Sequence, residues 1–385
     1  MFSPQVEWLP PTEFPDLSKY DEIAIDLETK DPNLKTMGSG SVTGQGQIVG
    51  IAVAVHDWSG YYPIRHEGGG NMDHEIVTRW FQNVLKTPAK KIFHNAMYDV
   101  CFLRAERYEI QGTIIDTMIA GSLVDENRFR YDLGSMGRDY VGKGKNEAVL
   151  AETAKEWGID PKSEMYKLPA MYVGEYAEQD ARLTLELWQE MKKEIIAQDI
   201  ESIFQLETSL FPCLVDMRFL GVRVDIEAAH RLKQKLVQEE NQCLQQVKKE
   251  TGIDTQIWAA RSIAQVFEKL SLPFDRTEKT QAPSFTKNFL QNHPHPMVQK
   301  IARAREINKA HTTFIDTIIK HEHEGRIFAE INQLRSDQGG TVTGRFSYAN
   351  PNLQQIPARN KELGPMIRSL FIPEQDCKWG VFDYS

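Results

Sequence analysis

The chain has 385 residues, of which 41% are hydrophobic and 26% charged, and a formal net charge of −9 at pH 7. This length predicts two or three domains, each able to bury a core, and the acidic balance argues against a chain that binds nucleic acid over its whole surface. The sequence contains no run of about 18 apolar residues, so no membrane span is expected. The N-terminus also lacks the features of a signal peptide. The four cysteines lie far apart, as in a reduced protein without a disulfide framework or a zinc site.

Strand patterns come first along the chain. Residues 22–27 alternate well enough for a strand, and residues 48–55 form the continuous apolar run that is typical of a strand buried in a sheet. The Gly- and Ser-rich residues 37–47 between them predict a loop. A third strand is predicted over 91–94.

Helical patterns follow, over residues 96–107 and, in the longest stretch, over 172–199. Strands first, and helices that return to them, predict an α/β domain over residues 1–200.

Residues 201–325 predict a separate, mainly helical domain. Three long amphipathic stretches lie within it, over 201–219, 226–250 and 296–320. Between the first two, Gly221 is placed to end a helix and Asp225 to cap the next one. The segment from Lys300 to His311 carries four basic residues against one acid, which predicts a locally basic surface: Lys300, Arg303, Arg305 and Lys309 against Glu306.

The pattern changes again over residues 326–385. A strand is predicted over 326–334, turns over 339–357, and a last strand over 378–383 after a short helix.

Acidic residues recur in pairs that one strand or one helical turn would bring together. Asp26 and Glu28 are two apart at a strand end, so both side chains share a face. Asn95 and Asp99, and likewise Tyr176 and Asp180, are four apart on helices. Each pair alone has an ordinary explanation: solvated edge acids, a helix N-cap, or a polar helix surface.

Taken together, these residues are what a site for two hard divalent cations would need. The oxygen ligands would be Asp26, Glu28, Asp99 and Asp180, and the Tyr176 phenol could orient an attacking water molecule. Such an acidic pocket beside basic surfaces suits a metal-dependent enzyme that acts on a polyanion.

The order acid-x-acid, Asn-x-x-x-Asp, Tyr-x-x-x-Asp resembles the three motifs of the tyrosine-containing DEDD class of 3′→5′ exonucleases. The resemblance implies a ribonuclease H-like domain with a central mixed sheet. It also implies that Asp26, Glu28 and Asp180 hold one Mg²⁺ or Mn²⁺ ion, that Asp26 bridges to a second ion, and that Asp99 holds the second ion through water. Tyr176 would position the nucleophile, and the terminal nucleotides of a DNA strand would meet Thr29, Asn95 and Tyr98.

The C-terminal part resembles family A DNA polymerases, the bacterial polymerase I and phage replicative class. Residues 341–357 match its T-x-GR-x-S…PNLQ-x-IP motif, although Tyr348-Ala349 is bulkier than usual there. Residues 220–225 resemble the base of that family's thumb, and 381–385 the start of its palm. The resemblance implies a thumb over 201–325 and a palm that begins at 326. It places Arg345 and Gln354 at the primer terminus and makes Asp383 a ligand of the polymerase metals.

The implied function is proofreading within a replicative DNA polymerase, in a bacterial cell or a phage-infected host. Since Asp26 lies so early in the chain, a phage-type enzyme is favoured. We expect a cytoplasmic monomer that binds single-stranded 3′ ends and primer–template duplex, with a processivity factor as a candidate partner.

The palm would be incomplete, because a second palm carboxylate and the fingers helix would have to follow Asp383. We therefore expect the exonuclease site to be the complete one, and the 385-residue chain not to extend a primer. Three alternatives stay open: a stand-alone exonuclease that acts on RNA, a DNA-binding platform with an inert nuclease site, and a structural protein with fortuitous acids.

Overall fold

The computed structural model describes residues 6–337 and 339–384, which form two compact units. Unit 1 consists of Met1–Leu220 and Phe328–Asn352, and unit 2 of Gly221–Ile327 and Leu353–Ser385. The expected domains 1–200, 201–325 and 326–385 divide the chain differently, and as functional domains they stay predictions.

A five-stranded mixed sheet lies at the centre of unit 1, in the order β3-β2-β1-β4-β5. Its strands are β1 (Glu22–Lys30), β2 (Gln47–Val55), β3 (Trp58–Pro63), β4 (Lys90–Phe93) and β5 (Ile114–Asp116). β2 pairs antiparallel with both β1 and β3, whereas β4 runs parallel to both β1 and β5. The expected α/β fold with a central mixed sheet is confirmed, and β3 and β5 are strands that the sequence did not predict.

The two faces of the sheet are covered by different helices. The helices of one face are α2 (His74–Leu85), α3 (Ala96–Ala105) and α8 (Glu201–Leu220). Those of the other face are α4 (Thr117–Val124), α5 (Leu133–Met136) and α7 (Gly174–Ala197). Around them lie α1 (Leu34–Met37), the π-helix η1 (Gly137–Val141), α6 (Ala148–Trp157), and the 3-10 turns η2 (Met165–Lys167) and η3 (Ala170–Tyr172).

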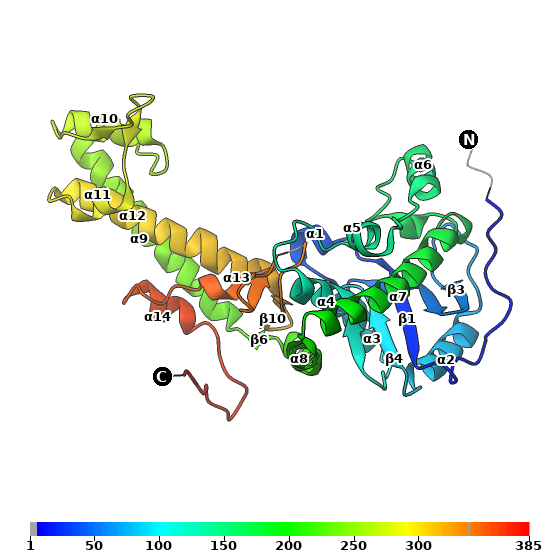
Figure 1. Cartoon of the computed structure of the whole chain (residues 1–385). Helices are drawn as coiled ribbons and strands as arrows, with labels where there is room; N and C mark the ends of the chain where they lie inside the picture. The colour runs from blue at the N-terminus through cyan, green and yellow to red at the C-terminus, as the bar shows by residue number, and fades with distance from the viewer. Residues whose placement is uncertain (1–5, 338, 385) are drawn as a thin grey trace. The chain divides into compact units, whose positions relative to one another are not determined.

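Side-chain alternation along β1 decides which residues face α7. The odd-numbered residues between 22 and 28 are apolar and pack with α2 and α3. On the other face, Ala24, Ala52 and Ala54 form a core with α7, and their small side chains let the helix cross close to the sheet (Figure 1). Asp26 and Glu28 follow Ala24 on this same face, because strand side chains alternate.

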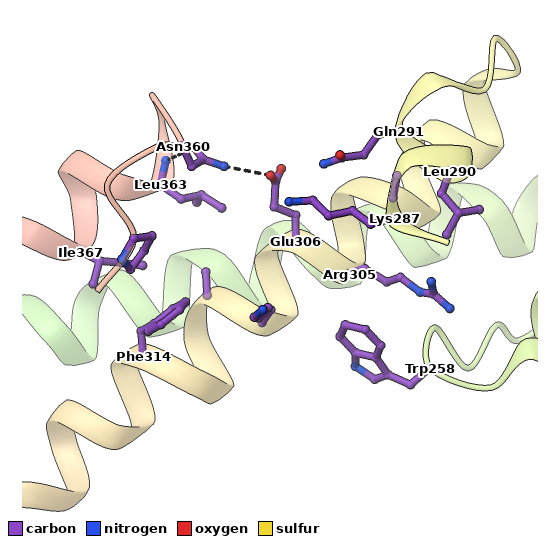
Figure 2. A pocket seen from close by; sticks show the side chains of 14 residues that line it. Trp258, Lys287, Leu290, Gln291, Arg305, Glu306, Phe314, Asn360, Leu363 and Ile367 are labelled. Carbon is purple, nitrogen blue, oxygen red and sulfur yellow. Dashed lines mark hydrogen bonds between the residues drawn. The ribbon is translucent and has the colours of Figure 1, made fainter. Parts of the chain in front are cut away.

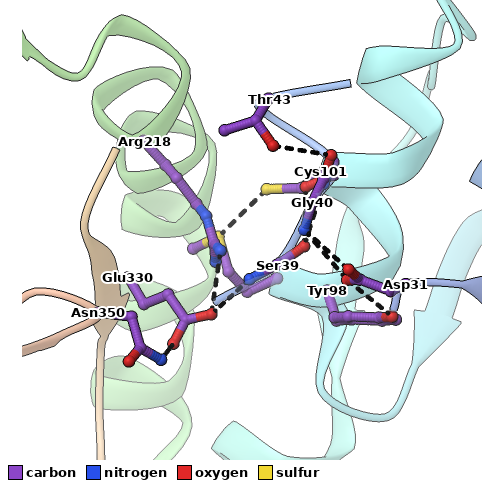
Figure 3. A network of polar contacts seen from close by, with 11 residues as sticks. Asp31, Ser39, Gly40, Thr43, Tyr98, Cys101, Arg218, Glu330 and Asn350 are labelled. Atoms are coloured by element: carbon purple, nitrogen blue, oxygen red, sulfur yellow. Dashed lines mark hydrogen bonds and ion pairs between the residues drawn. The ribbon is translucent and has the colours of Figure 1, made fainter. Parts of the chain in front are cut away.

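A segment from the C-terminal part of the chain completes unit 1. Its strands β11 (Glu330–Asn332) and β12 (Ser347–Ala349) pair antiparallel. Glu330 accepts a hydrogen bond from the Ser39 backbone N at 2.9 Å and another from Asn350 Nδ2 at 2.8 Å (Figure 3). The predicted single strand over 326–334 is therefore wrong: it is split between β10 (Arg326–Ile327) of unit 2 and β11 of unit 1, because the chain passes from one unit to the other between them.

Unit 2 is built on two long helices, α9 (Ile226–Thr251) and α12 (Pro296–Lys309), which pack along each other. Figure 1 shows α10 (Ala260–Lys269) and α11 (Lys287–Asn292) gathered at the end where α9 stops. The predicted helix over 296–320 contains a π-helical segment, η4 (Ala310–Ile315), before α13 (Asp316–His321). The predicted junction is confirmed, since Gly221 has φ 58° and Asp225 caps α9 by accepting a hydrogen bond from the Ala228 N at 2.8 Å.

Short elements complete unit 2. They are β6 (Val222–Arg223), β7 (Asp275–Arg276), β8 (Pro283–Ser284), β9 (Glu322–His323), the 3-10 turn η5 (Leu353–Gln355) and α14 (Leu363–Arg368). The predicted last strand over 378–383 is wrong, because these residues have no regular secondary structure and no strand within the described ranges pairs with them. None of the described helices is long and apolar enough to span a membrane.

Candidate active site

Asp26 and Glu28 lie on the face of β1 that packs against α7, close enough for the Asp180 carboxylate of α7 to act on both. Tyr176 and Asp180 stand one turn apart near the N-terminal end of α7, which packs against β1. Asp180 is 2% exposed and Glu28 6% exposed, so these carboxyls lie inside the protein. The face-sharing and turn spacing expected for the two pairs are therefore present, and the sheet–helix packing brings the pairs together.

The helix α3 supplies the remaining predicted acid. Asp99 is 5% exposed, and its Oδ1 accepts a hydrogen bond from the backbone N of Leu27 at 3.1 Å. Leu27 lies between Asp26 and Glu28 on β1, so this bond fixes Asp99 beside both. All five residues predicted to be catalytic thus lie in one cluster, although their roles stay predictions.

Burial and mutual repulsion hold these acids toward their protonated forms. Burial and the nearby Asp180 carboxylate raise the pKa of Asp26 to about 7. The same causes, burial first and then neighbouring carboxylates, raise the pKa of Glu28 and of Asp99 well above their ordinary values. Burial also raises the pKa of the Tyr176 phenol, which stays protonated at neutral pH. A divalent cation would relieve this repulsion.

A lysine that the sequence did not single out touches the cluster. Lys145 Nζ donates to Asp180 Oδ2 and, at 3.2 Å, to the hydroxyl of Tyr176. Burial, the largest single cause, lowers the pKa of Lys145, but the neighbouring carboxylates, Asp180 first, together raise it by more, so the net shift is upward. Lys145 lies in an irregular segment between η1 and α6, where no periodic pattern could have indicated that it points inward.

The chemistry of the cluster fits a hard cation. Carboxylate oxygens are the ligands that Mg²⁺ and Mn²⁺ prefer. Within the described residues, Asp180 Oδ1 is buried and has no hydrogen-bond partner, as expected of an oxygen that binds a metal ion. Across residues 6–337 and 339–384, no three His, Cys, Asp or Glu side chains already stand in an arrangement that would hold an ion. The cation that touches Asp180 in this arrangement is the Lys145 ammonium.

The residues predicted to contact the terminal nucleotides lie beside the acids. The hydroxyls of Thr29 and Tyr98 are hydrogen-bonded at 2.7 Å, and the Tyr98 hydroxyl also donates to Asp31 Oδ2 at 3.3 Å. The Tyr98 ring is tilted against Phe102, with 5.0 Å between the ring centroids. Tyr98 is thus held in place by its hydroxyl and by its ring.

Asn95 precedes α3 but does not cap it through its side chain. It has φ 65°, and within the described part of the chain its side chain makes no capping bond. The cap comes from Asp116, whose two carboxylate oxygens accept hydrogen bonds from the backbone N of Asn95 at 3.0 Å and of Ala96 at 2.9 Å. Asp116 was missed, since its position is a recognisable capping signal for α4, which follows it, and not for α3.

The polymerase-motif residues are distributed over both units. Arg345 is exposed in unit 1, on a turn where Thr341 Oγ1 donates to its carbonyl at 2.7 Å. Gln354 and Asp383 are exposed in unit 2. The roles predicted for these three residues stay predictions.

Unit 2 contains a separate cavity of about 420 Å³, and the predicted site residues are not among the described residues that line it. Figure 2 shows Trp258 and Arg305 on one side of it and Phe314 and Ile367 on the other. Arg305 donates to the carbonyls of Ile257 and Phe285, so its charge is turned to the protein's own backbone.

Some of the basic residues of α12 thus bind other groups of the protein itself. Arg303 forms ion pairs with Glu239, Glu306 and Glu362. Lys309, by contrast, is exposed, and Lys300 is half-buried.

Comparisons with known proteins identify both parts of the chain. Residues 14–196 match the 3′-5′ exonuclease family and residues 226–385 match DNA polymerase family A. A DNA-directed DNA polymerase of Pseudomonas phage M6 is 34% identical over 98% of this chain and 59% of its own length. DNA polymerase I of Pseudomonas aeruginosa is 28% identical over 96% of this chain and 40% of its own length. The chain therefore spans about three fifths or less of these relatives.

A solved structure shows the same fold. The POL domain of Pol1 from M. smegmatis, in complex with DNA primer-template and dNTP, superposes with a TM-score of 0.69 and 19% identity. The alignment covers 92% of this chain and 56% of that one. The expected ribonuclease H-like fold of the exonuclease domain is confirmed. By these matches the chain resembles family A DNA polymerases in its C-terminal part and the 3′-5′ exonuclease family in its N-terminal part.

Proposed function

We propose that the cluster in unit 1 is a 3′→5′ exonuclease site that hydrolyses the terminal phosphodiester of a DNA strand and releases nucleoside monophosphates. The observation that carries the proposal is the convergence of four acids and a tyrosine from β1, α3 and α7. One oxygen of this cluster, Asp180 Oδ1, is buried and has no hydrogen-bond partner among the described residues. The match of residues 14–196 to the 3′-5′ exonuclease family supports it.

Asp26, Glu28 and Asp180 would hold one divalent ion, Mg²⁺ or Mn²⁺, and Asp26 with Asp99 would hold the second. When bound, the two ions would lower the pKa of the attacking water and stabilise the leaving 3′ oxygen. Tyr176 contributes a protonated phenol beside Asp180, which can orient that water through a hydrogen bond. The hydrogen bond from Leu27 to Asp99 keeps this acid in register with β1.

The 3′ end of the strand would lie over Thr29, Asn95 and Tyr98. A tyrosine ring can stack on any base, so it holds an end without reading its sequence. The hydrogen bond between Thr29 and Tyr98, together with Phe102 against the ring, fixes Tyr98 before the DNA arrives.

For the whole protein we propose proofreading during DNA replication, alongside DNA-directed DNA synthesis. In that activity Arg345 and Gln354 would contact the primer terminus, Asp383 would bind the polymerase metals, and the helices of unit 2 would hold duplex DNA through its phosphates. We also propose that the enzyme acts in the cytoplasm of a bacterial cell or phage-infected host. It would act as a monomer, with a processivity factor as its partner.

The test is the double variant Asp26→Ala, Glu28→Ala, assayed on single-stranded DNA labelled at its 5′ end with Mg²⁺ present. The expected result is the loss of stepwise shortening from the 3′ end. Glu175→Ala is the matched control, because Glu175 is exposed on the first turn of α7 beside Tyr176. Degradation at the wild-type rate by the double variant would contradict the proposal.

Two further readings are separated by simple measurements. A stand-alone exonuclease of the RNA-processing type would degrade RNA faster than DNA of the same sequence. An inert platform would bind DNA but show no heat of Mn²⁺ binding in calorimetry, and the buried acids that repel one another argue against this reading.

A further inference from the structure

The segment that carries Lys145, residues 142–147, is fastened to α7 by contacts on both sides of this lysine. Gln179 accepts a hydrogen bond from the Asn146 backbone N at 3.1 Å and donates to the Gly144 carbonyl at 3.4 Å. Lys143 Nζ meets both carboxylate oxygens of Glu186, at 2.7 and 2.8 Å. These contacts hold Lys145 directly over the helix that presents Asp180.

Of the two lysines in this segment, only Lys145 points inward. The Lys143 side chain is 61% exposed, whereas that of Lys145 is 21% exposed and meets an Asp180 side chain that is 3% exposed. Lys145 Nζ also lies 5.1 Å from the centre of the Tyr176 ring. The ammonium thus stands at the inner edge of the acidic cluster and contacts one proposed metal ligand and the proposed water-orienting phenol.

A divalent ion and this ammonium compete for the same carboxylate. Oδ2 of Asp180 receives the Lys145 donor, while Oδ1 is buried and, within the described residues, without a partner. An ion that binds Oδ1 would therefore stand next to a positive charge on Oδ2, and two cations in a buried site repel strongly.

We propose that the Lys145 ammonium is the built-in counter-ion of the metal-free site: it stabilises Asp180 and Tyr176 when no ion is bound, and it leaves Asp180 when a divalent ion binds. The inference rests on the proposed exonuclease function and adds a residue that sets its metal affinity. Lys145 is a positioning residue, because it acts through Asp180 and Tyr176.

The test compares Lys145→Met, which removes the charge and keeps the length, with the matched control Lys155→Met, which removes an exposed lysine of α6. Calorimetry with Mn²⁺ alone is expected to show about tenfold tighter binding for Lys145→Met than for the wild type, because the variant lacks the positive charge that repels the incoming ion. In EDTA the melting temperature of Lys145→Met is expected to lie below that of the wild type, and Mn²⁺ is expected to restore it. Lys155→Met should bind Mn²⁺ as the wild type does.

Lys145→Arg, which keeps the charge, is expected to bind Mn²⁺ as weakly as the wild type, and Lys145→Gln replaces Lys145→Met if that variant does not fold. Equal or weaker Mn²⁺ binding by the neutral variant would overturn the role of Lys145 and leave the exonuclease proposal standing. Failure of the wild type itself to bind Mn²⁺ would overturn both.

Discussion

Arg218 and Glu330 form an ion pair at 3.4 Å inside unit 1, where 5% of the Arg218 side chain and 18% of the Glu330 side chain are exposed. Arg218 belongs to α8 and Glu330 to β11, so the pair joins elements far apart in the sequence. With the hydrogen bonds from Ser39 and Asn350, both carboxylate oxygens of Glu330 are used (Figure 3). Glu330 therefore fastens the segment 328–352 to the rest of unit 1.

Glu330→Ala is expected to lower the free energy of unfolding of the protein by about 3 kcal/mol, because it leaves the Arg218 charge buried without its partner. Urea denaturation followed by circular dichroism measures this change. The double variant Arg218→Met, Glu330→Gln removes both charges and is expected to lose less than Glu330→Ala alone. An equal loss of unfolding free energy in the two variants would mean that the unpaired charge of Arg218 is not the cause of the loss.

Asp116 is the second residue whose loss should be costly. Its carboxylate accepts hydrogen bonds from the backbone N of Asn95, Ala96 and Met118, and burial raises its pKa to about 6. Asp116→Ala is expected to reduce the unfolding free energy by about 2 kcal/mol, since it strands buried N–H groups at the start of α3. Urea denaturation at pH 8 is the measurement.

The control is an ordinary helix cap at the surface. Asp73 is exposed and accepts a hydrogen bond from the Ile76 N at 3.0 Å at the start of α2. Asp73→Ala is expected to cost about 1 kcal/mol. If Asp116→Ala lowers the unfolding free energy no more than Asp73→Ala does, then the buried carboxylate stabilises the protein no more than an ordinary surface cap.

Local spacing made most of the acidic cluster predictable. Asp26 and Glu28 share a face because strands alternate, and Tyr176 and Asp180 share one because helices turn. What brings the two pairs together is the packing of α7 on Ala24 and its neighbours, which no local pattern encodes. For the same reason Lys145 escaped detection, since its place depends on how an irregular segment docks on α7.

The errors in the C-terminal part have a common cause. An alternating or apolar run describes a segment that can pair, but a strand forms only beside a partner. The strands within residues 326–334 pair with three strands, two of them in unit 2 and one in unit 1. Residues 378–383 pair with none of the described strands. A local sequence pattern carries no information on where the partner strand lies. Strand predictions are therefore weakest where the chain passes from one unit to the other.

His66 gives the protein a measurable sensitivity to acid. It is 3% exposed, its Nδ1 lies 3.0 Å from the Leu168 carbonyl and its Nε2 lies 2.6 Å from the Tyr61 hydroxyl. Nδ1 therefore carries the proton, and the Tyr61 hydroxyl donates to Nε2. Burial lowers the pKa of His66 from 6.5 to about 4.

Because the folded-state pKa of His66 is depressed, the unfolded chain binds its proton first as the pH falls below 6.5. The contribution of His66 to stability is thus complete above about pH 7 and declines between pH 6.5 and 4, by about 2 kcal/mol at pH 5. His66→Gln removes the titrating group, so its unfolding free energy should change less than that of the wild type between pH 7.5 and 5. Parallel pH curves for the two proteins would contradict this account.

Tyr176→Phe separates the orienting role of the phenol from metal binding. Loss of the hydroxyl is expected to slow 3′→5′ hydrolysis of single-stranded DNA by about 100-fold, the size of effect typical for one positioned proton donor or acceptor. Mn²⁺ affinity should stay close to that of the wild type, since the carboxylates remain. Single-turnover assays at saturating Mg²⁺ measure the rate, and Tyr172→Phe, one turn earlier and half-buried, is the matched control. A slow Tyr176→Phe enzyme with intact Mn²⁺ binding would place the phenol in the chemical step, whereas a wild-type rate would remove it from the mechanism.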